Sequence, residues 1–195
     1  MKTSKKRPRQ NARTAAAPRR VRYSVAVSLD GFIAGPKGEF DWIIIDPAFD
    51  FEAHFNQFDT FLLGRRTFEV AGQGGAGGTS AESQTIVFSR TLRQSDYPKV
   101  VIAREVKETI SALKQQPGKD IWLFGGGELF RSVLDAGLID TVEVAVMPIL
   151  LSEGVPLLAA GPRSPALQLT HSKTLPSGTV MLSYHVATKR KRKGR

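Results

Sequence analysis

Strand-forming and helix-forming segments alternate through most of this chain, and that alternation constrains the fold more than any other feature. It predicts an α/β fold with a mostly parallel sheet flanked by helices, because parallel strands need a crossover connection. From residue 141 onward strand follows strand, which predicts an antiparallel C-terminal edge. The expected strands are 21–29, 60–63, 85–88, 99–103, 120–124, 141–151, 167–170 and 179–186, and the expected helices are 49–58, 67–70, 106–116 and 128–136.

The charged residues divide the chain into a folded domain and two basic ends. Residues 1–22 contain nine Lys and Arg and no acid, and residues 189–195 contain six more. These ends lack the apolar periodicity needed to offset the entropy of ordering them. We therefore expect disordered basic tails at 1–21 and 188–195, and one domain at 22–187.

Composition excludes several classes of protein. A chain of 195 residues with 41% hydrophobic residues suits one core. The absence of cysteine excludes disulfides, thiolate metal sites and a cysteine nucleophile. The three histidines are scattered, so we expect no metal site. No apolar run is long enough to cross a bilayer, and we expect a cytoplasmic protein. The Arg-rich start also resembles an organelle transit peptide, which stays open as an alternative.

Three segments that directly follow strands, which we call strand exits, carry groups that suit a phosphorylated ligand. In a parallel sheet ligands bind beyond the carboxyl ends of the strands. The strand 120–124 leads into three glycines and a helix start, where backbone amides can approach a phosphate. Arg65, Arg66 and Thr67 follow the strand 60–63. Guanidinium groups pair with phosphate oxygens, although tight turns and surface arginines would give the same pattern.

The third exit, Ser89 and Arg90 after the strand 85–88, again combines a hydroxyl with a guanidinium. A second basic exit suggests a second phosphate, such as the one that distinguishes NADPH from NADH. The glycine-rich stretch 72–78 is expected to be a loop, and it lacks the lysine of a P-loop.

The helix expected at 49–58 has an apolar side and a polar side. Phe51, Phe55 and Phe58 are spaced as one apolar face. Asp50, His54 and Gln57 fall beside it, and this polar face could present a carboxylate to a ligand. For His54 and Gln57 a solvent-exposed position is the simpler interpretation.

The motifs VAVSLDGFIAG, DW, LLGRRTFE, VFSR, WLFGGGELFRSVLDAGLID and VEVAVMPILLSEGVPLL occur in this order. Together they resemble the dihydrofolate-reductase-like superfamily. More closely, the chain is similar to the C-terminal reductase domain of the bacterial bifunctional riboflavin enzyme and its stand-alone relatives. The resemblance covers about residues 22–187. It implies an eight-stranded, mostly parallel sheet, NADPH as hydride donor and a homodimer formed through the C-terminal strands.

The resemblance also assigns roles to individual residues. Asp30 and Trp42 would belong to a mobile first loop over the substrate. Asp50 would orient or protonate the substrate, although its spacing departs from that of folate reductases and Glu52 competes with it. The residues that would bind the cofactor are Ala26 and Ile33 at the nicotinamide, and Gly64, Arg65, Arg66, Thr67, Ser89, Arg90, Gly125, Gly126, Gly127, Glu128 and Leu129 along its phosphates and adenosine end.

The expected function is reduction of a small heterocyclic or sugar-imine substrate by NADPH. By resemblance the best candidate is 5-amino-6-(5-phosphoribosylamino)uracil, an intermediate of riboflavin synthesis. A dihydrofolate or pteridine reductase is a second hypothesis. A third is a nucleic-acid-associated protein that acts through its basic tails, which contain no aromatic residue for base stacking.

Overall fold

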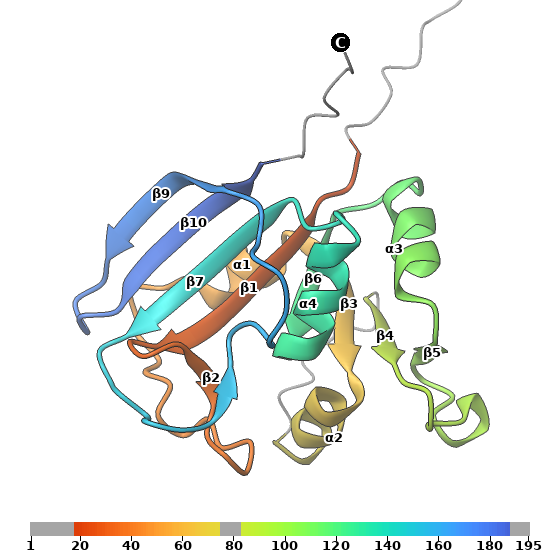
Figure 1. The fold of residues 1–195 in the computed structure, drawn as a ribbon, viewed down its shortest axis with the longest axis horizontal. Coiled ribbons are helices and arrows are strands. Elements are labelled where there is room, and N and C mark those ends of the chain that lie inside the picture. Colours follow the sequence, from red (N-terminus) through yellow and green to blue (C-terminus); the bar gives the residue numbers. More distant parts are fainter. Residues whose placement is uncertain (1–17, 75–82, 188–195) are drawn as a thin grey trace, which may run out of the picture.

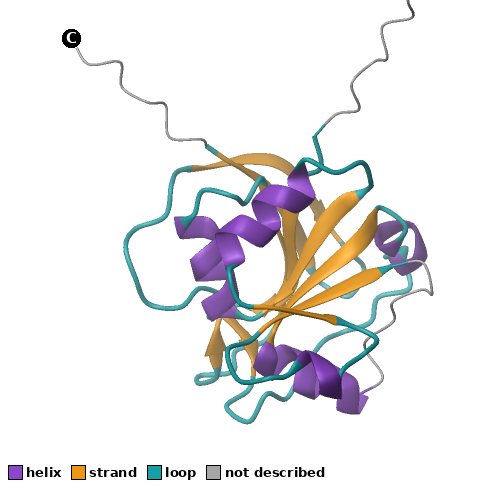
Figure 2. Cartoon of the chain, turned by 90° about the vertical axis from the view of Figure 1, so that its right-hand side faces the viewer, coloured by secondary structure: helices purple, strands orange, loops and turns teal. Residues whose placement is uncertain are grey.

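The computed structural model describes residues 18–74 and 83–187, and these form one eight-stranded sheet with helices on both faces (Figures 1 and 2). The strand order is β5-β4-β3-β6-β1-β7-β10-β9. The six strands from β5 to β7 pair in parallel, and β10 and β9 follow as antiparallel neighbours. The expected architecture is therefore confirmed. The strands of this sheet are β1 (Val21–Ser28), β3 (Phe58–Gly64), β4 (Gln84–Phe88), β5 (Val101–Ala103), β6 (Asp120–Gly125), β7 (Thr141–Met147), β9 (Leu167–Thr174) and β10 (Val180–Val186).

The helices pack against the two faces of this sheet. The alternate residues Val21, Tyr23 and Val27 of β1 face α3 and α4, where the ring of Tyr23 stacks on Phe130 with centroids 3.9 Å apart. The opposite face carries an aromatic cluster around Trp122, which α1 and α2 cover. The helices are α1 (Phe51–Phe55), α2 (Arg65–Gly74), α3 (Val106–Lys114) and α4 (Gly127–Asp135), with a 3-10 turn at Gln94–Asp96.

A second, two-stranded sheet of β2 (Phe32–Ala34) and β8 (Val155–Pro156) was not expected from the sequence. These strands are too short to show a period of two. They lie where the parallel strands end, near the bottom of Figure 1. The strand expected at 141–151 ends at Met147, because Pro148 cannot donate a backbone hydrogen bond to a ladder.

The helix expected at 49–58 proves to be only five residues long. Asn56 ends it, and Phe58 already belongs to β3, so the three phenylalanines do not share one helical face. Phe55 packs against the aromatic cluster, whereas Phe51 is 40% exposed. The helix expected at 67–70 instead runs from Arg65 to Gly74, and this takes in part of the stretch 72–78 that we expected to be a loop.

Arg19, which precedes the predicted start of the domain at residue 22, contacts the sheet. Arg19 is buried, and its guanidinium donates to the carbonyl oxygen of Lys119 at 2.6 Å and to Oγ1 of Thr60 at 2.7 Å. It also pairs with Asp59. Residues 1–17, 75–82 and 188–195 lie outside the described part of the chain, so the disorder expected for the tails and the nucleic-acid hypothesis stay predictions. Within the described part, no helix combines the length and apolar character needed to span a bilayer.

Candidate active site

Two of the three predicted strand exits meet at one edge of the sheet. β3 and β6 are neighbours, with Leu63 paired to Gly125. A Cβ atom on Gly64 would lie 3.7 Å from the carbonyl oxygen of Gly125, and one on Gly126 would lie 3.4 Å from Oγ1 of Thr67. We call Gly64, Gly125, Gly126 and Thr67 the glycine edge. Its backbone is open to close approach because none of its glycines carries a side chain.

The first turn of α4 adds backbone donors to the glycine edge. Gly126 is the N-cap of this helix, and no side chain caps it. The first amides of an α-helix have no partner within the helix, and the helix dipole favours an anion beside them. Glu128 is exposed and Leu129 is buried in the core, so Leu129 can contribute only its backbone. This arrangement fits the phosphate-binding role predicted for 125–129.

Gly127 has a different role from the two glycines before it. A Cβ atom at this position would lie 2.4 Å from the carbonyl oxygen of Pro156 in β8. The missing side chain therefore serves the packing of α4 against the two-stranded sheet.

The third exit lies beside the other two, because Gly64 pairs with Phe88 at the end of β4. Ser89 is buried there, and its hydroxyl accepts hydrogen bonds from the amides of Thr91 at 3.2 Å and Leu92 at 3.0 Å. This hydroxyl therefore shapes the turn after β4. The guanidinium of Arg90 is exposed beside it.

The two arginines at the start of α2 differ in their partners. Arg65 forms an ion pair with Glu69, one helical turn further on, at 3.0 Å. Arg66 is exposed and forms no ion pair with another described residue, so its guanidinium remains available to an anion. Amides, glycines and a free arginine thus gather along the carboxyl ends of three adjacent strands, and this combination suits a dinucleotide phosphate.

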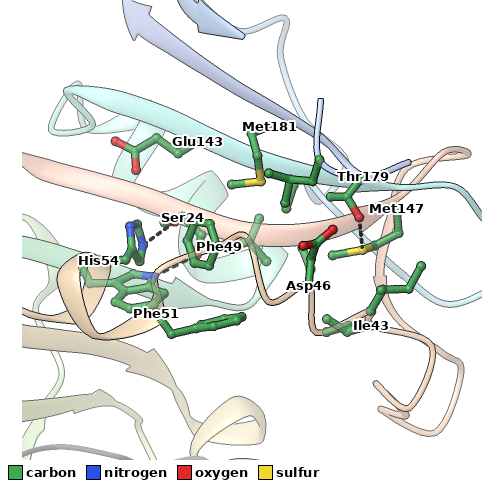
Figure 3. Close-up of a pocket in the computed structure, with 16 residues that line it drawn as sticks. Ser24, Ile43, Asp46, Phe49, Phe51, His54, Glu143, Met147, Thr179 and Met181 are labelled. Carbon is green, nitrogen blue, oxygen red and sulfur yellow. Dashed lines mark hydrogen bonds between the residues drawn. The ribbon is translucent and has the colours of Figure 1, made fainter. Parts of the chain in front are cut away.

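A cavity of about 120 Å³, which we call the inner cavity, lies on the α1 side of the sheet (Figure 3). β1, β7 and β10 form its floor, and the segment 43–51 with α1 covers it. Ala26 of β1 and its pairing partner Ala145 of β7 both line it. The lining is mostly apolar and comprises Ser24, Val25, Ala26, Ile43, Ile44, Asp46, Phe49, Phe51, His54, Trp122, Glu143, Ala145, Met147, Leu175, Thr179 and Met181.

A histidine and a serine form a pair at one end of this cavity. Nε2 of His54 lies 3.1 Å from Oγ of Ser24. The imidazole is enclosed by aromatic rings, with centroid distances of 5.0 Å to Trp122, 5.3 Å to Phe58 and 5.4 Å to Phe49. Burial lowers the pKa of His54, since a charged imidazole is poorly solvated there. The expectation that His54 lies on a solvent-exposed face is therefore wrong.

Asp46 lies toward the other end of the inner cavity (Figure 3). Its carboxylate accepts hydrogen bonds from the amides of Ala48 and Ser177, each at 2.8 Å. Hydrogen bonds from Ser177 and Ala48 lower the pKa of Asp46, which keeps it ionised at neutral pH. These bonds also tie the segment that covers the cavity to the turn between β9 and β10.

The structure gives the predicted substrate carboxylate, Asp50, a local role. Asp50 is the N-cap of α1, where its side chain accepts from the amide of Ala53 at 2.8 Å. It is exposed and does not line the inner cavity. Its substrate role stays a prediction, and Asp46 is the aspartate that the geometry brings into the cleft.

The other residues predicted around the substrate and the nicotinamide do not line the inner cavity. Asp30 accepts from Ser28 Oγ at 2.6 Å and from the amides of Leu151 and Ser152, so it joins the exit of β1 to the segment after β7. The hydrogen bond from Ser28 is the main cause that lowers the pKa of Asp30. Trp42 is half-buried, outside the cavity lining. Ile33 of β2 packs against the core.

Sequence reasoning missed Ser24, Asp46 and Glu143 as cleft residues. A signal for two of them was present in the strands. Arg22, Ser24 and Ala26 alternate with apolar residues in a central strand, and Glu143 interrupts an apolar one. Polar or small residues on one face of a central strand indicate that this face borders a cleft. Asp46 lies in an irregular segment, where no periodicity could reveal it.

Solved structures with the same architecture place this chain in a known fold class. A protein of Shewanella sp. PV-4 that has been assigned to riboflavin biosynthesis shares 25% identity and superposes with a TM-score of 0.73, over 86% of this chain and 99% of its own. Dihydrofolate reductase from Enterococcus faecalis, in complex with NADP(H), is 16% identical with a TM-score of 0.62, over 86% and 96%. The fold is that of the dihydrofolate-reductase-like class.

The chain belongs to the family of the RibD C-terminal domain, whose model matches residues 19–181. The uncharacterized protein YyaP of Bacillus subtilis (strain 168) is 36% identical over 178 residues, which cover 86% of this chain and 95% of YyaP. Membership of this family indicates a reductase-type oxidoreductase. The family resemblance predicted from the sequence motifs is confirmed.

Proposed function

We propose that the protein is an NADPH-dependent reductase that binds a small, flat heterocyclic substrate in the inner cavity. One observation carries the proposal: the glycine edge and the cavity lie next to each other in the strand order. β6, which ends in the glycine edge, is the neighbour of β1, whose Ala26 lines the cavity. A dinucleotide that begins at Ser89 and crosses Gly64 and Gly126 would bring its nicotinamide end to Ala26.

NADPH, when bound, would supply the hydride. The chain would contribute positioning, because apolar walls such as Phe49, Trp122 and Met181 hold a flat ring and exclude water. Reduction of a C=N or C=C bond by hydride also consumes one proton. The Ser24–His54 pair is suited to handle that proton, since both side chains line the cavity and are within hydrogen-bonding distance.

The resemblance favours a ribosylamino-pyrimidine as substrate, and a pteridine is the alternative. Both contain a planar ring with polar edges, and the inner cavity combines flat apolar walls with polar groups at its ends. Dihydrofolate-dependent oxidation of NADPH, compared with the same assay on the ribosylamino-uracil phosphate, separates the two.

Cofactor binding can be tested by titrating NADPH while following its fluorescence. We expect saturation in the micromolar range, and about tenfold weaker binding by Arg66→Ala, since one phosphate contact with a guanidinium contributes about 1.5 kcal/mol. Arg163→Ala is the matched control, because Arg163 is exposed and remote in sequence from the glycine edge. The proposal would be rejected if the fluorescence of NADPH with the protein equals that of the free cofactor up to millimolar concentration.

A further inference from the structure

A second cavity, of about 200 Å³, continues from the inner cavity toward β9, and we call it the outer chamber. The two cavities share six lining residues, including Ser24, His54 and Glu143, so they form one cleft. The outer chamber differs from the inner cavity in its own lining, which adds Arg22, His171, Lys173, Leu182 and Ser183.

Glu143, the carboxylate that lines the outer chamber, already forms an ion pair with Arg22. Nε and Nη2 of Arg22 donate to the two carboxylate oxygens of Glu143 at 2.7 and 2.8 Å. Nη1 donates to Gln57 and Asp120. These four bonds use four of the five guanidinium N–H donors. The side chain of Arg22 is only 9% exposed, so the chamber has a buried cation with a spare donor.

Two further basic side chains reach the chamber from β9. His171 and Lys173 are two residues apart on a strand and therefore project from the same face. Their pairing partners on β10 are Ser183 and Met181, which also line the chamber. Among the described residues neither His171 nor Lys173 has an ion pair or a hydrogen-bonded side chain. Asp46, the other carboxylate of the cleft, lines only the inner cavity, although the positive charge of Lys173 contributes to its lowered pKa.

We propose that the outer chamber binds an anionic arm, a phosphate or a carboxylate, of the molecule whose ring fills the inner cavity. Lys173 supplies a charge that has no ion-pair partner among the described residues, and His171 supplies a ring N–H donor. Glu143 and Asp120 hold the nearly buried guanidinium of Arg22 in place. The identity of the ring rests on the proposed reductase function. The anion site itself stands on these side chains alone.

The chain has three histidines, and this makes the site visible to NMR. Two of them, His54 and His171, line the outer chamber, whereas His185 lines neither cavity. The apoprotein is titrated with inorganic phosphate at constant pH and ionic strength, and the imidazole carbon-bound protons are followed. We expect saturable shifts for His54 and His171 and a much smaller shift for His185.

Variants identify the side chain that holds the anion. Lys173→Met is expected to weaken phosphate binding at least fivefold. Lys107→Met, which removes an exposed lysine of α3, is expected to bind like the wild type. A parallel titration with acetate shows whether the chamber prefers a phosphate or a carboxylate arm. Any one of three outcomes would overturn the proposal: equal shifts of all three histidines, shifts that do not saturate, or unchanged phosphate binding by Lys173→Met.

This titration contains no NADPH, so its outcome is independent of the proposed function. Saturable phosphate binding at His171 without NADPH binding would retain the anion site and reject the reductase. NADPH binding with no phosphate effect at His54 and His171 would support the reductase and reject the anion site.

Discussion

The carbonyl oxygen of Pro156 lies 2.4 Å from the position that a Cβ atom on Gly127 would occupy. Pro156 belongs to β8, which pairs with β2, and Gly127 begins α4, which packs on the core of the main sheet. A backbone oxygen in a paired strand cannot rotate away as a side chain can. This one position therefore fixes how closely the two-stranded sheet approaches the helix that borders the glycine edge.

Gly127→Ala should therefore destabilise the protein. We expect the free energy of unfolding to fall by about 1–3 kcal/mol, the usual cost of adding a methyl group where nothing can yield. Urea denaturation followed by circular dichroism measures this change. Thr141→Ser, a conservative substitution in β7, is the control for a nonspecific effect of substitution on stability. Wild-type stability of Gly127→Ala would show that β8 is free to move.

Gly126→Ala should affect binding rather than folding. Its Cβ atom would lie 3.4 Å from Oγ1 of Thr67, and its backbone has a negative φ that alanine tolerates. We expect a loss of stability below about 1 kcal/mol. NADPH should bind about tenfold more weakly, which corresponds to about 1.4 kcal/mol, because the methyl group enters the glycine edge. Fluorescence titration measures the affinity, and unchanged affinity would place the phosphates elsewhere.

The fold could be predicted from the sequence where elements are long and periodic. The alternation of strands and helices, the strand into 125–127 and the antiparallel end were all recovered, because each depends on local pattern. Phe58 shows the limit of such reasoning. Its spacing from Phe55 fits a helix, yet the chain leaves the helix at Asn56 and Phe58 packs under Trp122. Tertiary packing decided that boundary, and no local signal records it.

The site divides in the same way. Gly64 ends β3, and Thr67 and Gly126 come soon after strands, so the rule that parallel strands end at one edge predicted that they lie close together. Asp46 lies in the cleft, where Ser177, far along the chain, donates a hydrogen bond to it. Asp50, which sequence reasoning preferred, satisfies the start of its own helix. Spacing cannot distinguish a capping aspartate from one that faces a cavity.

Two asparagine variants distinguish these aspartates. Asp50→Asn should leave stability within about 0.5 kcal/mol of the wild type, because Asn and Asp cap helices about equally. Asp46→Asn should lower the free energy of unfolding by about 1–2 kcal/mol, since a charged acceptor of the Ala48 and Ser177 hydrogen bonds is replaced by a neutral one. Thermal or urea unfolding of both proteins at pH 7 measures the difference.

The same two variants also test the role of each aspartate in catalysis. We expect Asp50→Asn to retain NADPH oxidation within about twofold and Asp46→Asn to raise KM, because the segment over the cavity is then attached more weakly to the β9–β10 turn. A hundredfold fall of kcat in Asp50→Asn with normal stability would instead support the catalytic role predicted from the sequence.

Because the pKa of Asp46 is lowered in the folded protein, the stability that Asp46 contributes is present at neutral pH. This contribution is lost as the pH falls below the ordinary pKa of an aspartate.

His54 gives stability a second dependence on pH. Burial lowers the pKa of His54 in the folded protein, whereas in the unfolded chain it titrates at about 6.5. Below that pH the unfolded state binds a proton that the folded state resists, so folding loses stability as the pH falls from about 6.5 through the folded pKa. Above about pH 7.5 both states are neutral and the effect disappears.

The His54→Phe variant isolates this contribution, since phenylalanine preserves an aromatic ring beside Trp122 and Phe58 and does not titrate. Urea denaturation at several pH values between 5 and 8 should show the wild type losing more stability toward acid than His54→Phe. His185→Phe controls for removing an exposed histidine. Parallel pH curves for wild type and His54→Phe would contradict this expectation, because they would mean that the folded protein does not disfavour the charged imidazole beside Ser24.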